Sequence, residues 1–423
     1  MKDAGKTLVL LTAGFPFGSG EQFLETEIRY LCEAFEKVII VPKERKPPMR
    51  TVPSNAAVDG SFHFYQAKTF SYRAKTVLRC LLSACFYREL FARPGAIYGI
   101  SRLRVLMPFI DAALQTRAWF GKNLAEKSIG LENTVFYTYW FGDQTLGLAI
   151  SGRGSLRPAT VSRAHGIDLY EERSDPPYLP CRKEILKGVK RVYAVSDNGK
   201  RYLSRRHPER SAVIGVSRLG VDDPGFDSAP SSDGVFRVVS CSFLVPVKRV
   251  DRIVGGLAEL ALRHPDRKIE WCHIGEGPLR WGLEAMAGRT LPPNVSSRFA
   301  GLFENREVIN FYRDNMVDVF INVSESEGVP VSIMEAQSCA IPVIATAVGG
   351  ASEIVNNESG FLLGADPGAA DIADALEAFM PPRANGEKKN RSKENWRGSY
   401  DARKNYSGFV MELRGLAGQK LSP

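Results

Sequence analysis

Two glutamates in the last third of the chain have a spacing that suits hydroxyl recognition. Glu327 and Glu335 lie eight positions apart. An apolar run ending at Val323 predicts a strand, and the pattern from Val331 predicts a helix, so Glu327 falls in a strand-to-helix loop and Glu335 within the helix. The free N–H groups of the first helical turn suit a phosphate or a hydroxyl oxygen, and carboxylates accept hydrogen bonds from vicinal hydroxyls. Without that context the two residues would be an exposed loop acid and a solvated helix acid.

Further candidates lie in the first half of the chain. Gly18 and Gly20 follow the first predicted strand, where glycines let the backbone approach a ligand closely, although a plain turn is the alternative. The run lacks a G-x-G-x-x-G dinucleotide fingerprint. His165 follows another predicted strand, where a lone histidine is more often structural than catalytic. Tyr139 or Trp140 could stack on a sugar at the end of an aromatic strand, although such residues usually belong to a core.

The elements that must position these residues alternate between short apolar runs and segments of helical period. The strands predicted in the first half are 7–12, 37–41, 135–139, 160–163, 191–195 and 212–215, with a long helical insertion at about 72–126 that Pro94-Gly95 interrupts. Those in the second half are 236–240, 269–274, 295–299, 317–323, 342–346 and 360–363. The alternation predicts an α/β fold of parallel sheets covered by helices. Ligands of such sheets bind beyond the carboxyl ends of the strands.

The length of 423 residues predicts two domains. The Pro-, Gly-, Ser- and Asp-rich run at 223–235 is typical of a linker. We therefore expect an N-terminal domain over 1–222 with a basic helical insertion at about 68–127, a C-terminal domain over 236–385 and a helical segment over 386–423.

The stretch from Ser324 to Val355 carries the most specific pattern. It reads Glu327-Gly328-Val329-Pro330, Glu335-Ala336, Pro342-Val343-Ile344-Ala345-Thr346, Gly349-Gly350 and Glu353-Ile354-Val355, and Gly360-Phe361-Leu362 follows it. This pattern resembles the signature of the retaining, nucleotide-sugar-dependent glycosyltransferases of family 4, which have the GT-B fold. The stretches SRAHGIDLY, VSDNGKRYL, LGVD, SCSFLVPVKRVDRIV, HIGEGPL and FAGLF resemble other parts of the family in the same order. The resemblance implies two Rossmann-like, doubly wound domains that face each other across a cleft.

The resemblance also implies roles for individual residues. His165, Lys248 and Glu327 would be catalytic. The donor would be bound by Gly18, Gly20, Arg249, Leu302, Gly328, Val329, Pro330 and Glu335. Lys248 would lie against the donor diphosphate, where a fixed cation stabilises the charge that develops as the glycosidic bond breaks. Phe243 stands where the family usually has an arginine, so Arg249 or another arginine supplies that charge, or catalysis is impaired.

The activity implied is transfer of a sugar, with retention, from a UDP- or GDP-sugar to a saccharide or lipid-linked acceptor in cell-surface polysaccharide biosynthesis. No metal or cofactor is expected, because no D-x-D resembles a metal grip and Asp222-Asp223 falls at the linker. A nucleotide-sugar epimerase or hydrolase of the same fold, and a nucleotide-sugar binder without catalysis, are the alternatives.

The net charge of +9 is concentrated in the insertion, where residues 68–127 carry eleven basic and three acidic residues. No nucleic-acid-binding motif accompanies it. Val77, Leu78, Leu81, Leu82, Cys85, Phe86 and Leu90 follow helical spacing beside these cations. Such a helix could rest on an anionic membrane or pack its apolar face on its own domain. Seven scattered cysteines favour reduced thiols. With no membrane-spanning run, we expect a cytoplasmic protein, peripheral at the inner face of the membrane if the insertion binds lipid.

Overall fold

The computed structural model describes residues 5–18, 20–62, 72–94, 99–126, 130–152, 157–380 and 382–417. The chain divides into two compact units. Unit 1 consists of residues 1–218 and 406–423, and unit 2 of residues 219–405. The linker run at 223–235 therefore belongs to unit 2, and most of the last helix belongs to unit 1.

Unit 1 is built on a parallel sheet with the strand order β3-β2-β1-β4-β5-β6-β7. The strands are β1 Thr7–Thr12, β2 Lys37–Pro42, β3 Ala56–Val58, β4 Thr134–Thr138, β5 Ala159–Ala164, β6 Arg191–Ala194 and β7 Ile214–Val216. Six of them confirm predicted strands to within two residues at each end. The prediction missed β3, because three residues are too few to show an alternating or apolar pattern.

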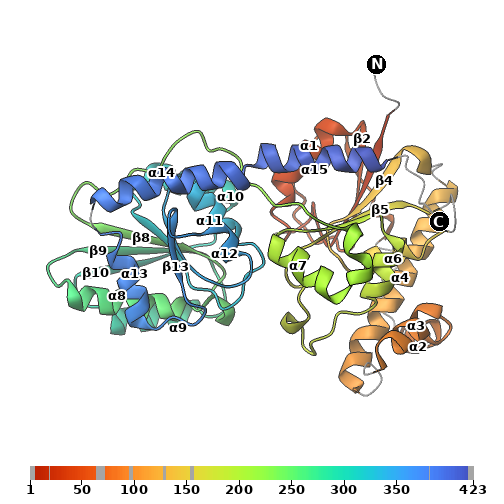
Figure 1. The fold of residues 1–423 in the computed structure, drawn as a ribbon, viewed down its shortest axis with the longest axis horizontal. Helices are drawn as coiled ribbons and strands as arrows, with labels where there is room; N and C mark the ends of the chain where they lie inside the picture. Colours follow the sequence, from red (N-terminus) through yellow and green to blue (C-terminus); the bar gives the residue numbers. More distant parts are fainter. Residues whose placement is uncertain are drawn as a thin grey trace. The chain divides into compact units, whose positions relative to one another are not determined.

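Helices cover both faces of this sheet (Figure 1). They are α1 Leu24–Ala34, α5 Asp143–Ala149, α6 Arg182–Gly188, α7 Asp197–Arg206 and α15 Ala402–Leu416. The last of these brings the C-terminal segment back to the sheet, where the Phe409 ring meets Tyr137 and Tyr193 at centroid distances of 5.2 and 5.4 Å. Burial of this aromatic contact attaches the end of the chain to unit 1.

The basic insertion forms three helices, α2 Tyr72–Leu81, α3 Ala84–Ala92 and α4 Ile100–Glu126. Pro94 lies in the break between α3 and α4, as expected, while Gly95 lies outside the described residues. The expectation of one amphipathic helix through residues 77–90 is wrong, since Ser83 ends the α2 segment and caps α3 by accepting a hydrogen bond from the Cys85 amide.

The two interpretations of that amphipathic segment each describe part of it. Cys85 and Phe86 are buried in the core of unit 1, whereas four apolar residues of α2 and its C-terminal turn are exposed: Val77, Leu78, Leu81 and Leu82. The break at Ser83 separates the face that packs on the domain from the face that does not.

Unit 2 contains a second parallel sheet, with the strand order β10-β9-β8-β11-β12-β13. Its strands are β8 Phe236–Cys241, β9 Ile269–Ile274, β10 Val295–Gly301, β11 Val319–Asn322, β12 Val343–Thr346 and β13 Gly360–Leu363. Its helices are α8 Val250–Arg263, α9 Arg280–Thr290, α10 Asn305–Asp314, α11 Val331–Ser338, α12 Ala351–Ile354, α13 Ala369–Glu377 and α14 Pro382–Ser399. All six predicted strands are confirmed.

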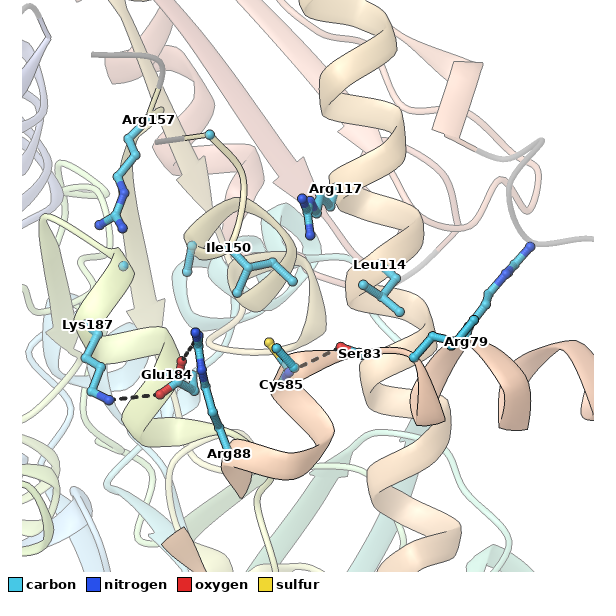
Figure 2. Close-up of a pocket in the computed structure, with 15 residues that line it drawn as sticks. Arg79, Ser83, Cys85, Arg88, Leu114, Arg117, Ile150, Arg157, Glu184 and Lys187 are labelled. Carbon is cyan, nitrogen blue, oxygen red and sulfur yellow. Dashed lines mark hydrogen bonds and ion pairs between the residues drawn. The ribbon is translucent and has the colours of Figure 1, made fainter. Parts of the chain in front are cut away.

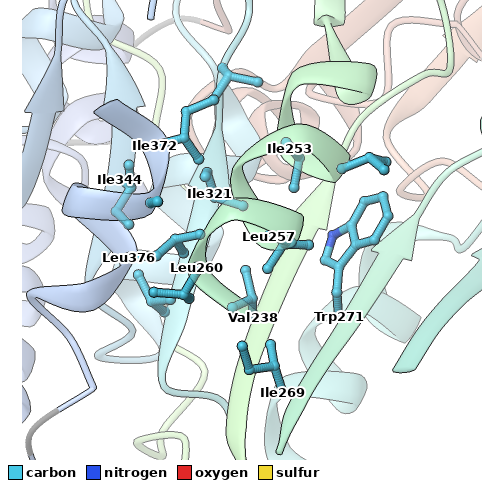
Figure 3. Packing of buried hydrophobic residues seen from close by; sticks show 14 of the residues in the cluster. Val238, Ile253, Leu257, Leu260, Ile269, Trp271, Ile321, Ile344, Ile372 and Leu376 are labelled. Atoms are coloured by element: carbon cyan, nitrogen blue, oxygen red, sulfur yellow. The ribbon is translucent and has the colours of Figure 1, made fainter. Parts of the chain in front are cut away.

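The core of unit 2 forms where α8 and α13 pack on the sheet (Figure 3). Leu257 and Leu260 of α8 lie against Trp271 of β9 and Leu376 of α13, and all four are fully or almost fully buried. This packing holds the sheet rigid, so that the loops at the carboxyl ends of its strands have a fixed base.

The strand order reverses direction once in each sheet, between β1 and β4 and between β8 and β11. At such a switch point the loops that leave two neighbouring strands diverge to opposite faces and open a crevice at the carboxyl edge. The loops after β8 and β11 carry Lys248 and Glu327, and those after β1 and β4 carry Glu21 and Trp140.

Candidate functional site

Lys248 and Glu327 form an ion pair across the switch point of unit 2. The Lys248 Nζ lies 2.6 Å from Glu327 Oε1, and the Asn322 amide donates to the same oxygen at 3.2 Å. The Glu325 amide binds the Val247 carbonyl at 2.8 Å and ties the two loops together. Glu327 is only 7% exposed, so it is not a solvated loop acid. The pair places one positive and one negative group at the edge where a ligand of this sheet would bind.

Arg249 is held by the loops around it. Its guanidinium donates to the carbonyls of Val323, Ser324 and Ala365 at 2.8–3.0 Å and to Asp366 at 3.0 Å. These bonds use four of the five N–H donors of the side chain. The sequence analysis expected Arg249 to bind the donor. In the structure the guanidinium joins the loops after β11 and β13, and its role as a donor ligand stays a prediction.

Phe243 follows β8 and is 59% exposed. The family arginine would stand here, so this position presents a hydrophobic ring in place of a cation. The loop is anchored to its neighbour, because the Leu244 amide donates to the Glu276 carbonyl at 2.9 Å and the Leu279 amide donates to the Leu244 carbonyl at 3.1 Å. Leu302, the expected base contact, is exposed just after β10.

The Gly328-Val329-Pro330 segment is positioned by the second glycine pair. The Gly350 amide donates to the Gly328 carbonyl at 2.8 Å, and a Cβ at position 350 would lie 2.2 Å from that carbonyl oxygen. Any side chain at Gly350 would therefore push this loop away. Pro330 is the N-cap of α11, so the loop leads directly to the free N–H groups of the helix start.

Glu335 lies within α11 and is only 6% exposed. Burial raises the pKa of its carboxyl from 4.5 to about 8, because an apolar environment disfavours the charged form. It is therefore not the solvated helix residue that its spacing alone would suggest. A neutral carboxyl can both donate and accept hydrogen bonds, which suits a hydroxyl ligand.

The loop after β1 contains a carboxylate that the sequence analysis missed. Glu21 has a left-handed backbone with φ of 55°. Its carboxylate accepts hydrogen bonds from the amides of Ala13, Gly14 and Phe15 at 2.7–2.9 Å and from the indole Nε1 of Trp140 at 2.6 Å. Consecutive amides that converge in this way form an anion-binding nest. Here the anion is part of the chain. The glycine pair just before this acid was the available signal.

The two glycines of that loop have different surroundings. Gly18 has a φ of +67° and donates its amide to the Pro48 carbonyl at 3.0 Å, whereas nothing lies within 4 Å of a Cβ at Gly20. Gly18 thus serves the turn, and donor binding by either glycine stays a prediction.

His165 lies after β5 against two aromatic rings. Its ring centroid is 4.5 Å from that of Tyr139 and 4.8 Å from that of Trp140, and its Nε2 is 3.1 Å from the Tyr139 carbonyl. Because a carbonyl only accepts, Nε2 carries the proton and Nδ1 keeps a lone pair. Burial, together with Arg163, lowers the pKa of His165 from 6.5 to about 3. Its amide is held by Asp168 at 2.7 Å.

The structure therefore groups the predicted residues by unit. In unit 2 it brings Lys248 together with Glu327, and in unit 1 it brings His165 together with Trp140 and, through Trp140, with Glu21. Asn322, Asp168 and Glu21 are the polar residues that the sequence analysis did not single out.

Three further features limit the chemistry available to the chain. Within the described residues, His, Cys, Asp and Glu side chains form no group of three or more that could hold a metal ion. All seven cysteines are free, as expected. None of the described helices has the length and apolar character needed to cross a bilayer.

Residues 236–380 match the family model described as glycosyl transferases group 1. Over 189 residues the chain is 29% identical to a human protein of the phosphatidylinositol N-acetylglucosaminyltransferase complex, covering 44% of this chain and 37% of the relative. It is 26% identical over 276 residues to the D-inositol 3-phosphate glycosyltransferase of Kribbella flavida, covering 59% and 63%. The chain thus spans less than two thirds of the length of these relatives.

Solved structures share the fold across nearly the whole chain. The lipopolysaccharide outer core galactosyltransferase WaaB, in its apo form, matches with a TM-score of 0.66 at 13% identity, covering 98% of this chain and 100% of that one. The Anabaena protein HepE in complex with UDP and glucose matches with a TM-score of 0.64 at 15% identity, covering 96% and 99%. Two parallel sheets with this topology are the α/β architecture called GT-B.

Proposed function

From the membership of the chain in the glycosyl transferases group 1 family, carried by residues 236–380, we propose that it transfers a sugar from a UDP- or GDP-sugar to a saccharide or lipid-linked acceptor with retention of configuration. The observation that carries this proposal is the Lys248–Glu327 pair at the switch point of unit 2. The complex of HepE with UDP and glucose supports a nucleotide-sugar donor, and the lipopolysaccharide galactosyltransferase WaaB supports a polysaccharide context.

Unit 2 supplies the proposed donor site. The leaving nucleoside diphosphate gains negative charge as the glycosidic bond breaks, and the Lys248 ammonium stabilises that charge more in the transition state than in the ground state. Glu327 holds the ammonium in place and accepts a hydrogen bond from a sugar hydroxyl through its remaining lone pairs. Glu335 binds a vicinal hydroxyl, while Leu302 and the Gly328–Pro330 loop contact the rest of the donor.

Unit 1 supplies the proposed acceptor side. A His165 with a pKa near 3 is neutral at physiological pH, so it orients a hydroxyl through the lone pair of Nδ1 and does not act as a general acid. Transfer with retention then requires no protein nucleophile: the leaving diphosphate itself takes the acceptor proton in a front-face attack. Neither a metal ion nor a cofactor is part of this mechanism.

The basic insertion of unit 1 adds a location to the proposal. We propose that it brings the protein to an anionic membrane surface at the cytoplasmic face. Such a location suits a lipid-linked acceptor, because the acceptor is confined to that surface.

Incubation with a panel of UDP- and GDP-sugars, with and without candidate acceptors, tests the proposed reaction. Free nucleoside diphosphate should accumulate only when both donor and acceptor are present. Lys248→Ala and Glu327→Ala should each lower that rate by about 10²–10³, and the exposed Lys268→Ala should not. Full activity in both site variants would overturn the assignment, and product formed without an acceptor would indicate an epimerase or hydrolase.

A second candidate function is nucleotide-sugar binding without turnover. Phe243 removes one expected cation, Arg249 is bound by loop carbonyls, and Glu327 neutralises Lys248. The site in unit 2 therefore offers a diphosphate little net positive charge. Calorimetric binding of a nucleotide sugar, combined with no diphosphate release across the acceptor panel, would favour this function.

A further inference from the structure

A large pocket in unit 1 lies outside the residues discussed so far. It has a volume of about 1090 Å³ and is lined by α2, α3, α4 and the ends of α5 and α6 (Figure 2). Its charged lining consists of five cations and one acid, namely Arg79, Arg88, Arg117, Arg157, Lys187 and Glu184. In Figure 2 the cations surround an apolar floor of Cys85, Leu114 and Ile150.

The acid of this pocket is shared between two of its cations. Arg88 and Lys187 each lie 3.0 Å from Glu184. Burial acts to raise the pKa of Glu184, but the hydrogen bonds and charges of Lys187 and Arg88 outweigh it and hold the pKa below the ordinary value. Glu184 is therefore ionised, and it neutralises only part of the charge around it.

Two other cations add uncompensated charge. Arg117 and Arg157 are exposed, and neither has a carboxylate partner within 4 Å among the described residues. Arg79 is paired with Asp111 at 3.2 Å, and Asp111 is not part of the pocket lining. The pocket therefore carries a net positive charge that no neighbouring group offsets, which favours a multiply charged anion.

An exposed apolar surface adjoins these cations. Leu82 lines the pocket and is 78% exposed, and Leu78 and Leu81 of α2 are also exposed. Phe91 of α3 is 86% exposed. We call these four residues the α2–α3 apolar face. Large apolar side chains gathered beside cations favour a ligand that is itself part apolar and part anionic.

The pocket lies away from the switch point of unit 1. Arg157 precedes β5, and Ile150 and Lys187 lie at the ends of α5 and α6, which run back from the carboxyl ends of their strands. These residues therefore stand at the amino-terminal edge of the sheet, whereas His165 and Trp140 stand at the carboxyl edge. A ligand in this pocket would not occupy the proposed acceptor position.

We propose that the pocket binds the phosphate headgroups of an anionic bilayer, with the α2–α3 apolar face entering the interfacial region. This inference rests on the membrane association proposed above and is independent of glycosyl transfer. It assigns the contact to Arg117, Arg157, Arg88 and Lys187 rather than to the insertion as a whole.

Flotation of the full chain with vesicles tests the inference. Vesicles of phosphatidylcholine with phosphatidylglycerol should carry the protein upward, and vesicles of phosphatidylcholine alone should not. A basic residue near an anionic surface is worth about a five-fold gain in binding. Arg117→Glu combined with Arg157→Glu should therefore lower the partition coefficient at least about 25-fold. Binding should also fall with added salt.

The matched control is Lys200→Glu combined with Arg205→Glu, two exposed cations on α7 of the same unit. It makes the same change in net charge and should lower binding far less. Leu78→Ser combined with Leu82→Ser provides a second variant that keeps every cation, and it should weaken binding by removing the apolar face. Equal losses in the pocket and control variants, or no loss in either pocket variant, would overturn the inference.

Two measurements separate this inference from its alternatives. Binding to glycerol phosphate in solution without binding to anionic vesicles would identify a soluble ligand and overturn it. Diphosphate release with a water-soluble acceptor and no vesicles reports on glycosyl transfer alone. Loss of vesicle binding in the pocket variant with that release unchanged supports the inference.

Discussion

The carboxylate of Glu21 binds the indole Nε1 of Trp140 at 2.6 Å, across the switch point between β1 and β4. The ion pair of Lys248 and Glu327 spans the equivalent position between β8 and β11. Each unit thus holds the two loops of its crevice together with a bond to a glutamate. In unit 1 that glutamate also fills an amide nest, and in unit 2 it faces an ammonium group.

Glu21→Ala should destabilise unit 1, because three backbone amides and the Trp140 indole lose their common acceptor. We expect a loss of about 2 kcal/mol in the free energy of unfolding, measured by urea denaturation. The exposed Glu33→Ala on α1 is the control and should change little.

The vacated nest should then accept an external anion. Phosphate should raise the melting temperature of Glu21→Ala more than that of the parent protein at matched ionic strength. Equal shifts in the two proteins would show that the amides do not form an anion site.

Lys248→Ala and Arg249→Ala should have opposite signatures. Lys248 has one charged partner and a partly exposed side chain, so its loss should reduce diphosphate release strongly with a small change in melting temperature. Arg249 is buried with bonds to three carbonyls and Asp366. Its loss should cost about 3 kcal/mol of stability. Thermal melting and diphosphate release, measured on both variants, decide between these roles, and a reversed pattern would contradict them.

The carboxyl of Glu335 should make stability depend on pH. Its pKa is about 8 in the folded chain against an ordinary value of 4.5. The folded state therefore holds a proton that the unfolded state releases, and the stabilisation is lost as the pH rises from about 5 through 8. The free energy of unfolding should fall by up to about 1.4 kcal/mol per pH unit relative to Glu335→Gln.

Urea denaturation of the parent protein and Glu335→Gln at several pH values checks this slope. Glu358→Gln, which changes an exposed acid, should track the parent protein. Parallel pH profiles for the parent protein and Glu335→Gln would mean that Glu335 is ionised in the folded state.

His165 should remain neutral throughout the range in which the protein works. Its pKa of about 3 lies far below the ordinary 6.5. Nitrogen-15 spectra of the imidazole, assigned by comparison with His165→Gln, should show no titration between about pH 5 and 8. A midpoint near 6.5 would restore a role as general acid or base.

The sequence by itself determined the elements and the loops that carry the chemistry. The six strands of unit 2 follow from short apolar runs, and Lys248 and Glu327 fall after β8 and β11 because those runs end there. These features are local: the hydrophobic period of a segment reports its own secondary structure. The parallel alternation of strands and helices then leaves few topologies open.

Only the tertiary structure decided what each side chain binds. Glu21 meets Trp140 over a separation of 119 residues, and Lys248 meets Glu327 over 79. The direction of the Arg249 guanidinium depends on the loop after β13, and the burial that raises the pKa of Glu335 depends on the packing of α11. Local sequence patterns carry no signal for such contacts, because partners and burial arise only when distant segments pack together.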